Sequence, residues 1–233
     1  GITYKFFYMK RFYALLVLAL VAVAPKVMAG DDEGYHRTYA GYSEVVVDWS
    51  KAADTNKSLY PFTQSFTLGH LGSTKLFSML PLHIEYGVNA QYTFGDSTSS
   101  LLGMTTNYNA SMLAVNIPIH ASLKLSLGEI GIIPYAGINL RGNILGTQVK
   151  ELKVGNTVTT TELRLFDDSD DKGAAGDDAW ERFQAGFSYG VSLYLGRLTV
   201  GVGVVSDLMP LVDYEDDNSA NITFNTLYVG FAF

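Results

Sequence analysis

The chain has 233 residues, a formal charge of −7 at pH 7 and no cysteine. Its excess of acidic residues argues against a nucleic-acid-binding protein, because such proteins need basic patches that contact phosphates. Without cysteine there is no disulfide framework and no thiol nucleophile. Apolar residues make up 48% of the chain, yet residues 30–233 contain no apolar run of helix-spanning length. The composition therefore leaves two classes, a secreted all-β domain or a membrane β-barrel.

The first predicted element is a secretory signal. A basic start is followed by an unbroken apolar run over residues 12–24, which is too short for a helix that crosses a bilayer of roughly 30 Å. A small-x-small site of the kind that signal peptidase cuts ends at Ala29. We expect translation to start at Met9, so that residues 1–29 are upstream sequence plus a cleaved signal peptide. Residues 30–233 are then predicted to form one β-barrel domain.

Period-two alternation of apolar and polar residues is the strongest pattern after the signal. In the clearest stretches one face is apolar, while the other carries Gly, Asn, Gln, Ser and ionisable residues. These stretches are longer than the usual strand of about five or six residues. An apolar face suits lipid and a polar face suits a narrow hydrated interior. The pattern predicts eight strands, at about 37–50, 63–75, 81–96, 108–127, 131–146, 181–195, 198–208 and 221–233.

The predicted connections alternate between short turns and long polar loops, as in bacterial outer-membrane barrels whose short turns face the periplasm. An even number of strands puts both ends of the barrel domain on the periplasmic side. Within the long third loop, residues 147–166 have Gly155-Asn156 at their centre and predict a hairpin that extends beyond the membrane. The sequence thus predicts an all-β fold, an eight-stranded antiparallel up-and-down transmembrane β-barrel.

The last predicted strand ends in aromatic residues. Leu227, Val229, Phe231 and Phe233 fall on one face, which we expect to contact lipid. We expect barrel-insertion machinery to read this final aromatic strand, so Phe231 and Phe233 are predicted to be needed for membrane assembly.

Aromatic residues are also predicted at the opposite rim of the barrel wall. Trp49 and Trp180 fall there beside Tyr108 and Phe94 when the predicted strands are aligned. Because aromatic side chains gather at membrane interfaces, we expect these four residues to form an outer girdle.

Four sequence blocks resemble a known family: LPLHIEYG at 80–87, NIPI at 116–119, PYAG at 134–137 and YVGFAF at 228–233. They are similar to those of the small eight-stranded outer-membrane barrels of the Bacteroidetes, the PorT-like family, and more loosely to OmpX and OmpW. The resemblance covers all of residues 30–233. It implies a fold and a location in the bacterial outer membrane, and it implies no catalytic motif.

Two local motifs are candidates for chemistry. His120-Ala121-Ser122 resembles the His-x-Ser pair of outer-membrane lipid A deacylases, in which His is the general base. Both side chains are expected to face the lumen, far from outer-leaflet lipid A, so a lumen-filling polar pair is the preferred interpretation. Residues 167–173 follow part of a calcium-loop spacing, but Ala179 takes the position of the bidentate Glu. We therefore expect no catalytic residue, metal site or cofactor.

The interior of an eight-stranded barrel is just wide enough for side chains to fill. We expect two polar layers to close it, with charges paired because unpaired charges in so narrow a space are costly. Counting from the periplasmic ends of the strands, the predicted lower layer contains Glu85 and Lys124 with His120 and His83, and the predicted upper layer contains Arg141 and Arg182 with Asp48.

These features predict an integral outer-membrane barrel that is not an enzyme and has a structural or surface-binding role through its long outer loops. One alternative is a narrow channel for small hydrophobic molecules, and the other, favoured least, is a lipid-modifying enzyme. The expected partners are outer-membrane lipids and lipopolysaccharide, the barrel-insertion machinery, and a surface ligand or protein that the sequence does not identify. Divalent cations could bridge the acidic loops to lipopolysaccharide phosphates.

Overall fold

The computed structural model describes residues 34–50, 58–166, 180–214 and 218–232. Antiparallel strands make up most of this part of the chain. Within the same ranges, no helix is long and apolar enough to cross a membrane. The strands are β1 (His36–Trp49), β2 (Gln64–Lys75), β3 (Leu82–Leu101), β4 (Met104–Leu123), β5 (Leu125–Leu127), β6 (Ile130–Val154), β7 (Thr157–Arg164), β8 (Phe183–Leu195), β9 (Leu198–Asp207), β10 (Val212–Tyr214) and β11 (Asn218–Ala232).

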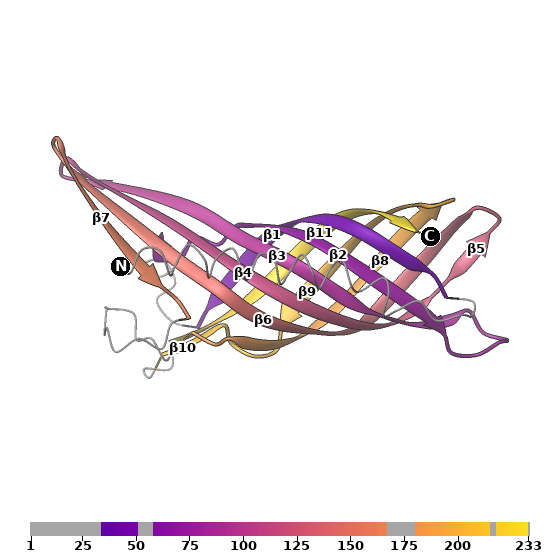
Figure 1. Ribbon diagram of the computed structural model, residues 1–233. Helices are drawn as coiled ribbons and strands as arrows, with labels where there is room; N and C mark the ends of the chain where they lie inside the picture. The colour runs from indigo at the N-terminus through magenta and orange to yellow at the C-terminus, as the bar shows by residue number, and fades with distance from the viewer. Residues whose placement is uncertain (1–33, 51–57, 167–179, 215–217, 233) are drawn as a thin grey trace, which may run out of the picture.

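Eight of these strands form a closed ring in the order β1, β2, β3, β4, β6, β8, β9 and β11 (Figure 1). The ring closes where β11 pairs antiparallel with β1, from Arg37 opposite Ala232 to Trp49 opposite Ala220. Each ring strand corresponds to one predicted strand, so the predicted eight-stranded antiparallel barrel is confirmed. The short turns, with β5 beside them, lie at one end of the barrel, which we call the turn end; the opposite end is the loop end.

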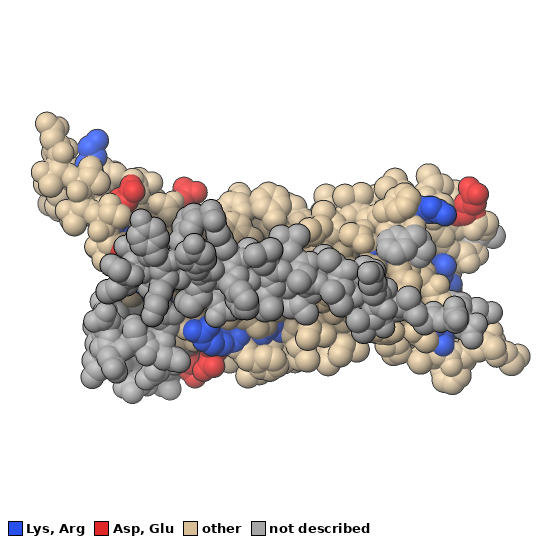
Figure 2. All heavy atoms as spheres, viewed as in Figure 1, with Lys and Arg blue, Asp and Glu red and all other residues tan. Residues whose placement is uncertain are grey.

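The outer surface of the barrel wall is apolar because alternate side chains of each strand point outward. On β11, Leu227 is 57% exposed whereas its neighbour Tyr228, which points inward, is 7% exposed. On the face drawn in Figure 2, charged side chains show at both ends, and uncharged atoms make up most of the described surface. An outward-facing apolar wall of this kind suits contact with hydrocarbon rather than water.

Two hairpins carry the sheet beyond the ring at the loop end (Figure 1). Pairing between β2 and β3 stops at Phe94, but β3 continues to Leu101 and β4 starts again at Met104. The neighbouring β6–β7 hairpin turns at Gly155-Asn156, where Gly155 has a φ of +58°, and this confirms the hairpin predicted for residues 147–166. We call these projecting parts of β3, β4, β6 and β7 the strand extension.

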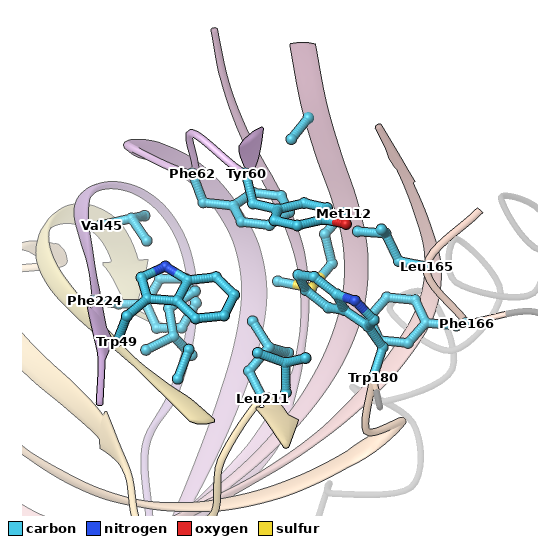
Figure 3. Packing of buried hydrophobic residues seen from close by; sticks show 14 residues of the cluster. Val45, Trp49, Tyr60, Phe62, Met112, Leu165, Phe166, Trp180, Leu211 and Phe224 are labelled. Carbon is cyan, nitrogen blue, oxygen red and sulfur yellow. The ribbon is translucent and has the colours of Figure 1, made fainter. Parts of the chain in front are cut away.

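The loop end of the interior is filled by buried apolar side chains, which we call the apolar plug (Figure 3). They come from the ring strands and from the connections between them. Trp180 lies against Tyr60, with 4.8 Å between ring centroids, and Trp49 stacks on the other side of Tyr60 at 6.3 Å. The plug contains Val45, Trp49, Tyr60, Phe62, Ala110, Met112, Leu165, Phe166, Trp180, Leu211, Val212, Ala220, Ile222 and Phe224.

The predicted aromatic girdle is therefore corrected, because Trp49 and Trp180 are buried inside the barrel rather than placed on its rim. Their burial removes apolar surface that the loops would otherwise expose to water.

Tyr108 lies on the strand extension, where Lys150 Nζ is 5.8 Å from the centre of its ring. Phe94, the fourth residue predicted for the girdle, does lie on the outer wall near the loop end, within a group of aromatic rings. Phe66 is its centre, with ring centroids 5.5 Å from Tyr42 and 5.8 Å from Phe94.

Pro118 interrupts the pairing of β3 with β4. Partner residues of β3 and β4 run to Tyr86 opposite Ile119 and resume at Asn89 opposite Asn116, so the register leaves a gap at the proline. The gap arises because proline has no N–H to donate to the neighbouring strand. On its other side Pro118 stays in register with Asn139 of β6.

Candidate functional site

The interior of the barrel holds the chemically distinctive side chains, arranged in layers. Nearest the turn end, Glu85 of β3 is completely buried and is contacted by Arg37 of β1, with 3.4 Å between Glu85 Oε1 and Arg37 Nη2. Tyr35 directly precedes β1, and its hydroxyl donates a hydrogen bond to the same carboxylate. Arg37 also donates to Ser192 Oγ at 2.7 Å. Pairing and hydrogen bonding together offset the cost of burying both charges.

His120 of β4 lies beside this ion pair. Its Nδ1 is 3.8 Å from Glu85 Oε2, and its Nε2 is 2.7 Å from Ser188 Oγ of β8. The imidazole stacks on the Tyr135 ring, with centroids 4.7 Å apart. The structure thus brings His120 to Ser188 on another strand, rather than pairing it with Ser122 of its own strand.

Lys124 lies further toward the turn end than the prediction placed it. Its Nζ is 5.0 Å from the centre of the Tyr35 ring and 5.5 Å from that of Tyr194, so aromatic faces hold the ammonium group. The predicted Glu85–Lys124 pair is corrected, because Arg37 takes the place opposite Glu85. His83 is buried next to this site, with Nδ1 3.1 Å from the Pro81 carbonyl oxygen.

A second ion pair lies toward the loop end. The Arg141 guanidinium of β6 donates to both carboxylate oxygens of Asp207 on β9, and both residues are buried. Arg141 Nη2 also donates to Gln184 Oε1 at 3.2 Å. The guanidinium lies 5.1 Å from the centre of the Phe224 ring, so this layer packs directly beneath the apolar plug.

The predicted partners of Arg141 are corrected. Asp48 is exposed on the outer face of β1, where it pairs in register with Asn221 of β11. Arg182 is exposed at the loop end, with Nη1 3.4 Å from the Ile144 carbonyl oxygen. Both residues lie outside the lumen because the phase of β1 places odd-numbered residues inward and because Arg182 precedes β8.

A ladder of amide side chains fills the space between the two ion pairs. Asn116 Nδ2 donates to Asn89 Oδ1 at 2.7 Å, and Asn139 Nδ2 donates to Asn116 Oδ1 at 3.0 Å. Asn89 Nδ2 in turn donates to the Tyr39 hydroxyl oxygen at 3.0 Å. Beside the ladder is a cavity of about 80 Å³, bordered by Arg37 at one side and by Phe224 of the apolar plug at the other.

Two residues of the ion pairs were not among the predicted site residues. Arg37 escapes notice because neither face of β1 is clearly apolar, so the sequence does not reveal which residues point inward. Asp207, by contrast, could have been predicted from the period-two alternation of β9. It continues, two residues at a time, the inward face of β9 that contains Gly201 and Gly203.

Some predicted sites fall outside the described residues: the signal segment 1–29, Phe233 and the acidic segment 167–173. Phe231 is described, and its side chain is exposed on the outer wall, opposite Leu198 and Thr38 in the two neighbouring strands. Within the described ranges, no three His, Asp or Glu side chains come together in a way that could hold a metal ion.

Comparison with known proteins identifies no family. No protein-family model matches the sequence, and no curated protein matches it. Among solved structures, Ail of Yersinia pestis is 8% identical with a TM-score of 0.37, covering 87% of this chain and 100% of Ail. Neisserial surface protein A is 10% identical with a TM-score of 0.39, covering 86% and 97%. The outer membrane enzyme PagL is 11% identical with a TM-score of 0.41, covering 84% and 98%.

Proposed function

We propose that the chain is an integral outer-membrane β-barrel without enzymatic activity, which acts as a surface-binding protein through the strand extension at its loop end. One observation carries the proposal: the interior is occupied by two ion-paired layers, an amide ladder and the apolar plug, whereas the sheet projects beyond the ring. Side chains that fill the lumen leave the projecting surface as the part able to meet a partner.

Insertion into a membrane is supported by the outer wall. A closed ring satisfies its backbone hydrogen bonds without an open edge, which is the condition for crossing hydrocarbon with strands. The wall is apolar between its two charged ends, and short turns at one end face long loops at the other, as in bacterial barrels. The resemblance to PorT-like barrels supports a bacterial outer membrane as the location, with lipopolysaccharide around the loop end.

The two alternative functions are less well supported. A channel for small hydrophobic molecules requires a continuous path, but the cavity of about 80 Å³ lies between the Arg37 layer and the apolar plug. A lipid-modifying enzyme requires its nucleophile and base to face lipid. The His120 ring does lie between the other two side chains, with Nε2 2.7 Å from Ser188 Oγ and Nδ1 3.8 Å from Glu85 Oε2. All three side chains, however, are buried and face the lumen.

The orientation can be tested by cysteine labelling, because the chain has no cysteine of its own. The Asn156→Cys variant places a thiol at the β6–β7 turn, and the matched Glu129→Cys variant places one at the turn end. A membrane-impermeant maleimide should label the Asn156→Cys variant on intact cells. It should label the Glu129→Cys variant only after the outer membrane is permeabilised. The reverse pattern would overturn the proposed topology.

The non-channel part of the proposal is tested in planar bilayers. The wild-type protein should show only background conductance, because paired charges and the apolar plug fill the interior. A steady single-channel current would remove this part of the proposal and favour the channel alternative.

A further inference from the structure

Among the described residues, β7 is the edge strand of the strand extension. β7 pairs with β6 from Thr157 opposite Val154 to Arg164 opposite Thr147. In the described part of the chain no strand pairs with its other side. Figure 1 shows β7 at the outer margin of the extension, away from the ring.

The hydrogen-bonding direction of each β7 residue follows from the register. The Leu165 backbone N–H donates to the Gly146 carbonyl oxygen at 2.9 Å, which fixes odd-numbered residues as those directed toward β6. Backbone direction alternates along an antiparallel strand. The N–H and C=O groups of Val158, Thr160 and Glu162 therefore point away from β6, toward the free edge.

The composition of β7 favours addition of another strand. Residues 157–163 have the sequence TVTTTEL, which is rich in β-branched residues and contains no proline or lysine. Natural proteins usually protect an exposed edge with proline, lysine, a bulge or a covering segment. Along this stretch the side chains are exposed, except for the partly covered Leu163.

We propose that the free edge of β7 is a strand-addition site, which takes an extended segment of a partner protein outside the cell. Backbone groups of Val158, Thr160 and Glu162 form hydrogen bonds with this segment. The inference rests on the proposed function and specifies how the surface binding takes place, by strand addition.

An exposed apolar row at the tip of the extension reaches β7 through Val154, which lies opposite Thr157, and can contact one end of the bound segment. Leu101, Met104 and Val154 are cross-strand partners on β3, β4 and β6, and all three are exposed.

Membrane geometry favours a separate segment over a second copy of the chain. Two copies in one membrane are related by an axis along the membrane normal, because any other two-fold axis would invert one barrel. Such an axis leaves both β7 strands running in the same direction, from the tip of the extension back toward the membrane. Antiparallel addition requires opposite directions, which an unattached segment can adopt freely.

The test compares two substitutions at one position. Thr160→Pro removes an N–H that points to the free edge and leaves the bonds to β6 intact, since proline is tolerated at such edge positions. Thr160→Val keeps the N–H and the β-branched shape. A phage-displayed library of random linear peptides is selected on the wild-type barrel in detergent, and the enriched peptides are measured on both variants.

The enriched peptides should bind the Thr160→Val variant like the wild type and the Thr160→Pro variant about tenfold more weakly, the effect of one lost hydrogen bond with its unsatisfied partner. Peptide binding should also slow amide exchange at Val158, Thr160 and Glu162. Equal binding to both variants, unchanged exchange, or no enriched peptide would overturn the inference. If cysteine labelling still places Asn156 outside the cell, the proposed function survives that failure.

Discussion

The buried Arg37–Glu85 pair is the residue-scale feature with the largest expected effect on stability. Arg37→Met leaves the Glu85 carboxylate buried without its cation, and removing one partner of such a pair costs about 3–5 kcal/mol. The double change with Glu85→Gln should cost less than the sum of the two single changes. Urea unfolding of the four proteins in lipid vesicles gives the coupling energy.

Lys124→Met is the matched control for that experiment. Lys124 is held by the faces of Tyr35 and Tyr194, so its coupling to Glu85→Gln should be much smaller than that of Arg37. A large coupling at Lys124 and none at Arg37 would mean that Glu85 pairs with Lys124, as strand counting predicted, and not with Arg37.

Leu102 at the tip of the β3–β4 hairpin is strained. Its φ is +49°, in the left-handed region that leucine rarely adopts, and its side chain is 89% exposed. Leu102→Asn should stabilise the hairpin by about 1 kcal/mol, because Asn tolerates this backbone conformation. Slower amide exchange across the β3–β4 pair would register the gain. Faster exchange in the variant would mean that Leu102 makes a stabilising contact.

At the scale of the element, the outer face of β11 predicts a dependence on membrane depth. Leu227→Arg puts a charge on the lipid-facing wall and should cost about 2–4 kcal/mol. Asn221→Arg, on the same face but near the loop end, should cost about 0–1 kcal/mol. Unfolding in vesicles measures both. Equal costs would indicate that this part of the wall does not lie in hydrocarbon.

The elements differ in how far their sequences predict them. In β3, β8 and β9 one face is clearly apolar, so alternation alone predicts both the strand and the direction of each side chain. β1 lacks this contrast, since Val46 points outward between Val45 and Val47 on the inward face. Its inward residues Arg37 and Trp49 could therefore be assigned only from the pairing of β1 with β11.

Contacts between strands distant in sequence were harder to predict than the strands themselves. Arg141 on β6 contacts Asp207 on β9 across the lumen, past β8, which lies between these two strands in the ring. No local sequence pattern indicates that the two residues are close. The apolar plug was missed for a similar reason. Tyr60 and Trp180 belong to connections that look polar in sequence, and only the folded loops bring them together.

For the whole molecule, the layers of the interior should act independently. Trp180→Ala removes a large side chain from the apolar plug and should cost about 3–5 kcal/mol, the usual effect of such a cavity. It should leave conductance at background, because both ion-paired layers remain. Thermal unfolding and planar-bilayer recordings on the same preparation check the two statements. An ion current in this variant would identify the plug as the principal barrier.

The pairing of β1 with β11 also constrains when the protein can fold. Its partners, such as Arg37 and Ala232, are almost as far apart in sequence as the described chain allows. Contacts of such high sequence separation form slowly, because a long loop must close before they are made. Until β11 arrives, β1 and β9 both present open edges that hydrocarbon cannot satisfy. The chain must therefore be kept unfolded during its passage to the membrane, and insertion must be coupled to ring closure in a single cooperative event.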